Sequence, residues 1–479
     1  MTPIPFVYYM IKGEINQWLG QQHERYGEVV RVMPNQLSYT AAEAQKDIHM
    51  PGRGFRHGYD KDPKFYMTFT GNKETPSTFT ANEADHERQR RLFQSAFSDR
   101  ALERQSPILI KYVNMLIDRL RDRAITGAAT NILDLYMFIT IDTQADLLFG
   151  EPFHLTENDK YDPWIASVLY YIHVGSQVMA FMQFVSFRVF WKPILWCLLA
   201  GKLESHYRHT SMRVDRRLAM KTPRDDIMKF VLEEGDANPK RCLTTNEIHS
   251  NAAHFWLAGS ETTTTTLSSV TYHLLKNPDA YKKVCQEIRS LFSSEEDMTM
   301  KALGQLRYVD ACIKEGQRMH TPVPFPLPRR VPPGGATIAG RFVPAGVTVA
   351  VATHAAHRWP TNFTMPNRFI PERWMYGTTE HTPFASDKAD ASQPFSLGPR
   401  GCIGKNMAYF QIRLIIAKIF FNFDMEPLPV CENWDNQKVY GMWEKPPLLV
   451  RVTRRRDIVG RGERTILQDM GEGTCEHEG

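Results

Sequence analysis

The chain has 479 residues, of which 42% are hydrophobic, and its 58 basic and 53 acidic residues leave a net charge of +5. This composition can fill a large core, whereas so mild a charge does not indicate a nucleic-acid-binding protein. The seven cysteines are an odd number without a C-x-x-C pair, so we expect a reducing compartment and no disulfide framework. Length alone suggests about three domains. Because we find no linker or repeat, we predict one domain over residues 1–456 and a polar tail over 457–479.

Two apolar segments are candidates for contact with a membrane. Residues 1–11 are apolar, but Lys12 follows, and the segment is shorter than the about 20 residues that span a bilayer. It also lacks the basic start and the small-residue cleavage site of a signal peptide. Residues 174–200 are rich in Met, Phe, Trp and Leu but are interrupted by Arg188 and Pro193. We interpret them as a surface or channel-lining segment that can dip into lipid.

Short strands are predicted at two places far apart in the chain. Residues 28–33 and 36–40, separated by Pro34-Asn35, predict a hairpin. Residues 337–338 and 347–352, separated by glycine and proline, predict strands that join the same sheet. Most of the remaining chain is helical in pattern, so we expect a mainly α-helical fold with a small β-rich lobe.

A long helix is predicted over residues 244–277. Thr244 and Glu247 have the spacing of a capping box, and Pro278 follows the end of the helix. Inside it, Gly259 weakens the helix by about 1 kcal/mol relative to alanine, and a run of threonines follows. A helix loosened in this way can kink and open a groove. The alternative is that the threonines only bond back to carbonyl groups one turn earlier.

Two pairs of polar side chains have spacings that place them on one helix face. His86 and Arg90 are four residues apart, and Glu315 and Arg318 are three apart. Taken alone, the first pair fits a charged surface helix. The second fits an exposed salt bridge, which contributes less than about 1 kcal/mol.

The segment 395–404, with the sequence FSLGPRGCIG, places Cys402 just before an apolar-periodic helix that we expect to begin near Asn406. The amides at the start of this helix would favour a cysteine thiolate. The glycines allow positive φ or a close approach to a flat group, and Arg400 offers a forked charge-assisted donor. Together these features indicate a metal-ligating cysteine; the alternative is a buried structural cysteine in a glycine-rich turn.

The same segment matches F-x-x-G-x-R-x-C-x-G and so resembles the haem-binding signature of the cytochrome P-450 superfamily. The sequence around Gly259 and Arg373 looks most like that of fungal members that modify secondary metabolites. A chance match is expected about once in several thousand chains of this length. Four more segments resemble family motifs in the family's order, so the resemblance extends from about Tyr26 to Arg454. They are residues 86–91, a W-x-x-x-R motif with histidine for tryptophan; residues 258–263, the [A/G]-G-x-[D/E]-T-[T/S] motif; residues 315–318, the E-x-x-R motif; and residues 369–374, similar to the P-E-R-F box.

The resemblance implies the family fold, haem b as cofactor and a role for each matching residue. Cys402 would be the axial ligand of the haem iron, and Glu261 and Thr262 would deliver protons to dioxygen. Glu315, Arg318 and Arg373 would form a structural cluster behind the haem. The other expected haem contacts are Arg400, His86, Arg90, Arg329, Arg330, Phe395, Gly398, Gly404, Ala258 and Gly259, with the choice between Arg329 and Arg330 left open. The expected substrate pocket is Phe255, Ala258, Val323, Phe325 and Met442.

The implied reaction is monooxygenation of a lipophilic substrate with O2 and electrons from NADPH. Because no G-x-G-x-x-G motif follows a strand, we expect a separate flavoprotein NADPH reductase, with a small haem electron carrier as a further donor. We expect a monomer at the cytosolic face of the endoplasmic reticulum membrane, held peripherally because the usual anchor helix is not seen; a cytoplasmic location is the alternative. Competing functions are a haem-thiolate isomerase or peroxygenase that uses no external electrons, and a non-catalytic haem sensor or electron carrier.

Overall fold

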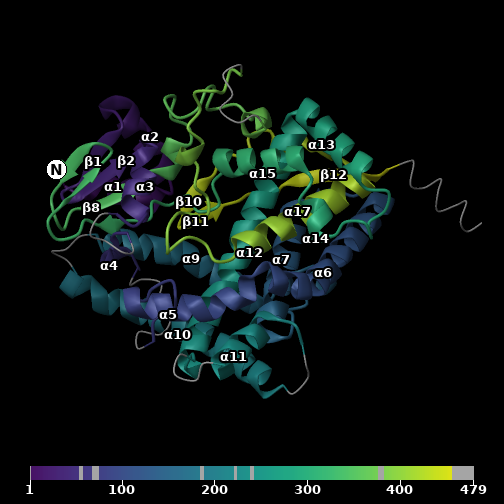
Figure 1. Ribbon diagram of the computed structural model, residues 1–479, viewed down its shortest axis with the longest axis horizontal. Helices are drawn as coiled ribbons and strands as arrows, with labels where there is room; N and C mark the ends of the chain where they lie inside the picture. Colours follow the sequence, from purple (N-terminus) through teal and green to yellow (C-terminus); the bar gives the residue numbers. More distant parts are fainter. Residues whose placement is uncertain are drawn as a thin grey trace, which may run out of the picture.

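The computed structural model describes residues 2–52, 58–66, 75–183, 188–220, 224–237, 242–375 and 382–455. The predicted tail, residues 457–479, lies outside this range, as do residues 184–187 of the apolar segment 174–200. Most of the described chain is helical (Figure 1), which confirms the predicted fold class. The helices are α1 (Ile4–Lys12), α2 (Ile15–Tyr26), α3 (Glu43–His49), α4 (Pro63–Tyr66), α5 (Glu83–Gln94), α6 (Asp99–Thr126), α7 (Ile132–Phe149), α8 (Leu155–Asn158), α9 (Pro163–Phe181), α10 (Arg188–Ala219), α11 (Ile227–Ala237), α12 (Thr245–Lys276), α13 (Pro278–Leu291), α14 (Met300–Leu303), α15 (Arg307–Met319), α16 (Thr353–Ala356) and α17 (Lys405–Asn422).

The main hydrophobic core lies where α6, α7, α12, α13, α15 and α17 meet. Helix α7 is apolar on nearly all sides, and every residue from Leu135 to Phe149 is buried. A helix of this kind needs neighbours on all faces. Helix α12 crosses the core beside it, and Figure 1 shows both close to the centre of the molecule.

Helix α12 has the start that its sequence predicts. The Thr244 hydroxyl accepts from the Glu247 amide at 3.3 Å, and a Glu247 carboxylate oxygen accepts from the Thr244 amide at 2.9 Å. The helix then runs through Gly259 to Lys276 without interruption. A β-carbon on Gly259 would lie 2.5 Å from Cδ of Gln144 on α7. This glycine therefore makes room for a neighbouring side chain instead of breaking the helix.

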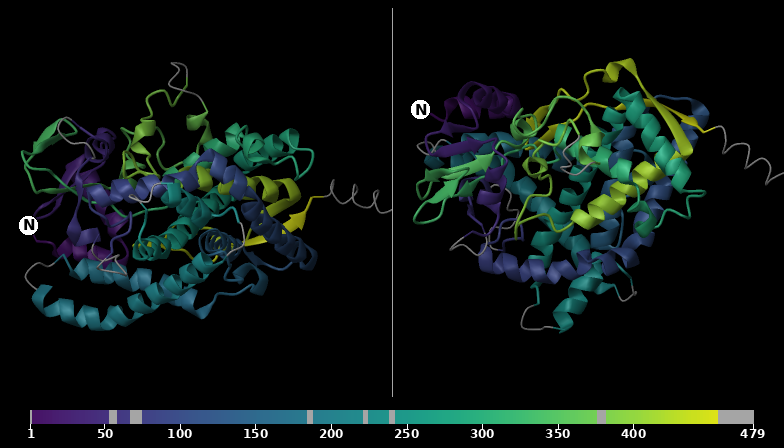
Figure 2. Two further views of the ribbon diagram at one scale, coloured as in Figure 1. Left: turned by 60° about the horizontal axis from the view of Figure 1, so that its bottom comes forward. Right: turned by 45° about the horizontal axis from the view of Figure 1, so that its top comes forward.

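The β-rich lobe lies with α1, α2 and α3 at one end of the molecule, and α6, α13 and α17 lie at the other (Figures 1 and 2). Its five-stranded sheet has the order β1-β2-β8-β5-β3. The predicted hairpin is present as antiparallel β1 and β2, and β8 pairs with β2 in parallel. One expectation was wrong: residues 337–338 belong to β6, which pairs with β7 in a separate hairpin because the turn between them closes locally. The strands are β1 (Val29–Met33), β2 (Gln36–Tyr39), β3 (Asp60–Lys61), β4 (Thr130–Asn131), β5 (Arg329–Arg330), β6 (Ala336–Ile338), β7 (Arg341–Val343), β8 (Thr348–Val351), β9 (Phe423–Pro427), β10 (Lys438–Tyr440), β11 (Met442–Glu444) and β12 (Leu449–Arg454).

Helix α17 begins three residues after Cys402, as the apolar periodicity predicts. It is followed directly by β9, which pairs with β12. Within the described residues, no helix is long and apolar enough to cross a membrane.

Candidate haem and oxygen site

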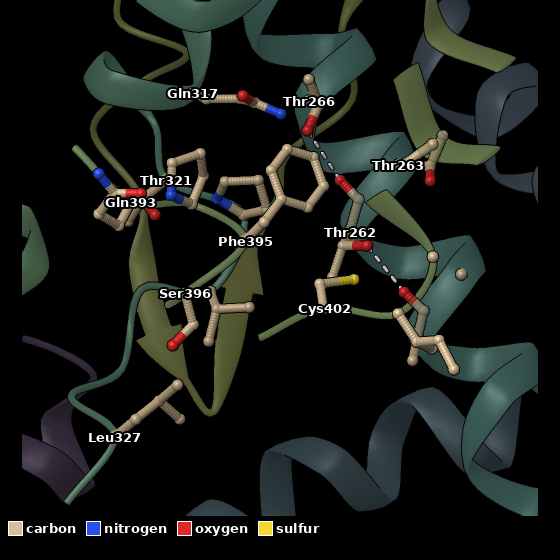
Figure 3. A pocket seen from close by; sticks show the side chains of 18 of the residues that line it. Thr262, Thr263, Thr266, Gln317, Thr321, Leu327, Gln393, Phe395, Ser396 and Cys402 are labelled. Carbon is tan, nitrogen blue, oxygen red and sulfur yellow. Dashed lines mark hydrogen bonds between the residues drawn. The ribbon is translucent and has the colours of Figure 1, made fainter. Parts of the chain in front are cut away.

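A cavity lies between the Cys402 loop with α17 on one side and the middle of α12 on the other. Cys402 and Thr262 both point into it (Figure 3). Ten of the predicted site residues line this cavity: Phe255, Ala258, Gly259, Thr262, Val323, Phe325, Phe395, Arg400, Cys402 and Gly404. Seven others, considered in turn below, do not belong to the described lining: His86, Arg90, Glu261, Arg329, Arg330, Gly398 and Met442.

The cysteine loop is held by its own backbone and by a neighbouring helix. The Cys402 amide donates to the Phe395 carbonyl at 2.8 Å, and Arg90 of α5 donates to the Gly401 carbonyl at 2.6 Å. Gly398 has φ of +71°, and a β-carbon there would lie 2.3 Å from the carbonyl oxygen of His49. Only glycine fits this position without moving backbone.

The electrostatic surroundings of the thiol act in two directions. Burial raises the pKa of Cys402 above its usual value, and a hydrogen bond from the Gly404 amide and the charges of Arg90 and Lys405 offset only part of this rise. The groups that lower the pKa are those that stabilise a thiolate. Arg90 thus acts on the cysteine loop without lining the cavity.

Thr262 and Thr266 of α12 donate their hydroxyl protons to carbonyl groups of the same helix. Thr262 Oγ donates to the Ala258 carbonyl at 2.7 Å, and Thr266 Oγ donates to the Thr262 carbonyl at 3.0 Å (Figure 3). This back-bonding is the alternative recognised in the sequence. It leaves the lone pairs of the Thr262 oxygen facing the cavity as acceptors.

The Glu261 side chain is not part of the described cavity lining, although its expected role in proton delivery requires it there. Its carboxylate pairs with the ammonium group of Lys445, and both side chains are 5% exposed. Lys445 follows β11 and also donates to the Trp443 carbonyl at 3.4 Å. A buried charge needs such a partner, so the pair fixes Glu261 outside the described cavity lining.

Glu315, Arg318 and Arg373 come together as the motifs predict. Both Arg318 Nε and Nη2 donate to the Glu315 carboxylate at 2.8 Å, and Arg373 Nε donates to it at 3.1 Å. Arg318 also donates to the carbonyls of His357 and Pro366, each at 2.7 Å. The cluster therefore ties α15 to the segment after β8, and all three side chains are buried.

A group of buried and half-buried basic side chains, Lys61, Arg329 and Arg400, borders the cavity. Arg329 is 3% exposed and donates to the Tyr66 hydroxyl at 3.0 Å. Burial lowers the pKa of Lys61 well below its usual value, and the nearby charges of Arg329 and Arg400 lower it further. Arg400 pairs with Glu83 at 3.4 Å. The group has more positive than negative charge and is suited to an added anion.

The geometry of β5 distinguishes Arg329 from Arg330, between which the sequence could not decide as a haem contact. Side chains alternate along β5, so Arg329 points inward while Arg330 is exposed and faces Asp62 at 3.9 Å. Arg330 is therefore not part of the buried cluster. His86 is buried on α5, four residues before Arg90.

Two contributors could not be recognised from the sequence. Lys61 stands between two aspartates, and Lys445 stands beside a glutamate and a proline, so both patterns indicate solvent-exposed lysines. Only the fold brings Lys61 to the arginines and Lys445 to Glu261. Met442, in contrast, was expected in the pocket, but β11 places it outside the described lining.

The arrangement fits a haem group. A flat ring can lie between Cys402 and α12, where Ala258, Gly259 and Phe395 offer an apolar border, and its carboxylates can be bound by the Lys61, Arg329 and Arg400 cluster. His49 also lines the cavity, and its Nδ1 is buried without a protein partner in the described structure. Burial and the Arg329 charge lower the pKa of His49 to about 3, so it stays neutral and free to accept or donate one hydrogen bond.

A haem protein with a cysteine thiolate as its iron ligand is the class that this site defines. The sequence model of the family "Cytochrome P-450" matches residues 1–451. The chain belongs to the cytochrome P-450 family.

Several relatives of this chain are fungal enzymes, and the matches cover most of both sequences. It is 38% identical over 452 residues to the cytochrome P-450 monooxygenase efuB of Hormonema carpetanum, covering 94% of this chain and 88% of that protein. It is 39% identical over 456 residues to the cytochrome P-450 monooxygenase astJ of Aspergillus oryzae, covering 95% and 90%. An averantin hydroxylase of Dothistroma septosporum is 36% identical, covering 95% and 85%. These matches confirm the predicted family and its haem-thiolate monooxygenase class.

Proposed function

We propose that this protein inserts one oxygen atom from O2 into a lipophilic small molecule of fungal secondary metabolism. The observation that carries the proposal is the placement of Cys402 and Thr262 on facing walls of one largely apolar cavity. Bound haem would supply oxygen activation, and the Cys402 thiolate would donate electron density to the iron. Phe255, Val323 and Phe325 give the substrate side an apolar wall.

The residues of the chain have separate tasks in this reaction. The apolar wall excludes bulk water, and the lone pairs of Thr262 can hold a water molecule in the cavity. Rotation of its hydroxyl away from the Ala258 carbonyl would free a proton donor at the Thr262 oxygen. Glu315, Arg318 and Arg373 are proposed to support the cysteine loop from behind.

We infer that electrons come from NADPH through a flavoprotein reductase, with a small haem protein as a further donor, and that the protein acts as a monomeric catalytic domain. We further infer peripheral binding to the cytosolic face of the endoplasmic reticulum membrane. Ile4 and Tyr8 of α1 and Phe342 of β7 are 59%, 50% and 68% exposed, and α1 lies at the end of the molecule that holds the β-rich lobe. Flotation with phospholipid vesicles tests this inference: protein that stays in solution would favour the cytoplasmic alternative.

The test of the proposed chemistry compares two threonine variants on one helix. With NADPH and a fungal reductase, Thr262→Ala should release more peroxide per O2 consumed than the unchanged protein. Thr265→Ala is the matched control, since Thr265 bonds back to the Glu261 carbonyl at 2.9 Å and is outside the described lining. Equal peroxide release from all three proteins would contradict the role of Thr262. Product formed with added peroxide but never with reductase would favour a peroxygenase.

A further inference from the structure

Gln317 is a buried polar side chain with no evident structural task. It lies on α15 between Glu315 and Arg318, is 1% exposed and lines the cavity. Neither its amide oxygen nor its amide nitrogen has a hydrogen-bond partner among the described residues. Its side chain extends toward Thr266 of α12 (Figure 3). The adjoining Gly316 carbonyl accepts from Ser269 Oγ at 2.9 Å, which holds this part of α15 against α12.

A second glutamine has the same properties on another wall. Gln411 of α17 is 1% exposed, lines the cavity, and has both amide atoms without a partner in the described part of the chain. Met407 lies one helical turn before it, and its sulfur is 3.9 Å from Nε2 of Gln144, which also lines the cavity. Two unpartnered amides on different helices thus face the same space.

Unpartnered buried amides are costly, so native proteins rarely keep them without a ligand or ordered water. A glutamine amide offers two N–H donors and one carbonyl acceptor. A buried water molecule typically makes about three hydrogen bonds, which these groups and the free lone pairs of Thr266 can supply. The haem ring has no hydrogen-bonding groups at its edge apart from its two carboxylates, and those match the cations Lys61, Arg329 and Arg400.

We propose that Gln317, Gln411 and Thr266 hold ordered water in a recess of the cavity, and that this water relays protons to Thr262. The inference rests on the proposed monooxygenase function. It gives protons that enter from solvent a path on the cavity side of α12, where Glu261 is turned away and paired with Lys445. Thr266 and Thr262 lie one turn apart on that side, so a short chain of water can connect them.

Proton supply determines whether O2 is reduced to hydrogen peroxide or to water, even without an organic substrate. Reduction of O2 to hydrogen peroxide uses two electrons and two protons, whereas reduction to two water molecules uses four of each. The ratio of NADPH oxidised to O2 consumed therefore measures how well protons reach the oxygen. The probe is O2 itself, so the test does not depend on the identity of the organic substrate.

The experiment measures this ratio and the peroxide released for the haem-loaded protein and three variants. Gln317→Leu removes the amide, and Gln317→Glu keeps two polar atoms facing the recess. The control is Gln105→Leu, because Gln105 of α6 is also fully buried with an unpartnered amide oxygen but lies outside the described lining. We expect Gln317→Leu to lower water formation about 10-fold, less than the about 100-fold of losing a proton-transfer group outright, because Thr262 remains. Gln317→Glu and the control should stay near the unchanged protein.

A solvent isotope effect and an unfolding measurement complete the test. In deuterium oxide, the rate of water formation should fall more for the unchanged protein than for Gln317→Leu, because only the unchanged protein uses the relay. Gln317→Leu should unfold at the same urea concentration as the unchanged protein or at a lower one. If water satisfies the Gln317 amide, the amide does not destabilise the folded protein, and its removal cannot stabilise it.

Three results would overturn the relay: a higher unfolding midpoint for Gln317→Leu, equal water formation in both proteins, or an unchanged protein that already returns all oxygen as peroxide. Failure of the proposed function would look different, because the protein would then consume no O2 with NADPH and reductase at all.

Discussion

Replacement of Glu315 by glutamine is the sharpest test of how the fold supports the site. The Glu315 carboxylate accepts five hydrogen bonds and donates none. Its Oε1 accepts from Arg318, Arg373 and the Ile370 amide, and its Oε2 accepts from Arg318 and from Trp374 Nε1 at 2.9 Å. Glutamine can keep its oxygen on one side only. Its NH2 group would then face two N–H donors. The buried Arg318 guanidinium would lose its counter-charge, whereas Arg373 would keep its ion pair with Asp387.

The size of the effect follows from the burial of the partners. The exposed fractions of the Glu315, Arg318 and Arg373 side chains are 0%, 0% and 1%. Removing one partner of a buried ion pair costs about 3–5 kcal/mol, because the remaining charge stays uncompensated. Domains are stable by about 5–15 kcal/mol, so Glu315→Gln should lose a large share of the unfolding free energy. Burial by itself raises the pKa of Glu315, but Arg318 and Arg373 more than offset this, so its pKa lies below the usual value.

The assay is urea unfolding followed by tryptophan fluorescence and by haem release. Glu87→Gln is the matched control, since Glu87 and Arg91 form a pair at 2.9 Å whose side chains are 54% and 52% exposed. This control should cost less than about 0.5 kcal/mol. If Glu315→Gln cost no more than the control, the cluster would not hold α15 to the segment after β8, and the reasoning would fail.

Two further predictions concern stability. Gly398→Ala should cost about 2–4 kcal/mol and reduce haem retention, because the position has positive φ and a β-carbon there would lie 2.3 Å from the His49 carbonyl oxygen. The control Gly20→Ala in α2, where a β-carbon meets nothing within 4 Å, should be neutral or stabilising. Equal urea midpoints for the two variants would contradict this prediction. Burial lowers the pKa of His273 to about 4 and that of His357 to about 3. In the unfolded chain these histidines take up a proton near pH 6.5, whereas in the folded protein they stay neutral to a lower pH. The free energy of unfolding should therefore be at its full value above pH 6.5 and fall toward pH 4 by about 1.4 kcal/mol per pH unit for each histidine. A free energy of unfolding that does not change over this range would refute the prediction.

Local patterns in the sequence predicted much of the helical framework. The capping box of Thr244 and Glu247, the hairpin around Pro34 and the helix after Cys402 depend on neighbouring residues, and the structure has all three. The motif residues Cys402 and Thr262 also reach one cavity. Each lies at a fixed position in a short motif, so the sequence could identify both residues, but their meeting depends on the packing of α12 against α17.

Contacts between distant segments could not be predicted from the sequence. Lys445 lies 184 positions from Glu261, yet their pairing removes Glu261 from the cavity. The inward and outward directions of Arg329 and Arg330 depend on the register of β5 with β8. Gly259 weakens an isolated helix, but here the core around Gln144 outweighs its propensity. In each case tertiary packing decided between alternatives that the local sequence permits.

The most direct test of the central claim is the optical spectrum of the reduced protein with carbon monoxide, compared with that of Cys402→His. The account predicts a red-shifted, thiolate-type band for the unchanged protein and its loss in the variant, with haem still bound by the cationic cluster. A protein that binds no haem, or a thiolate-type band that survives the substitution, would contradict the assignment of Cys402 as the iron ligand.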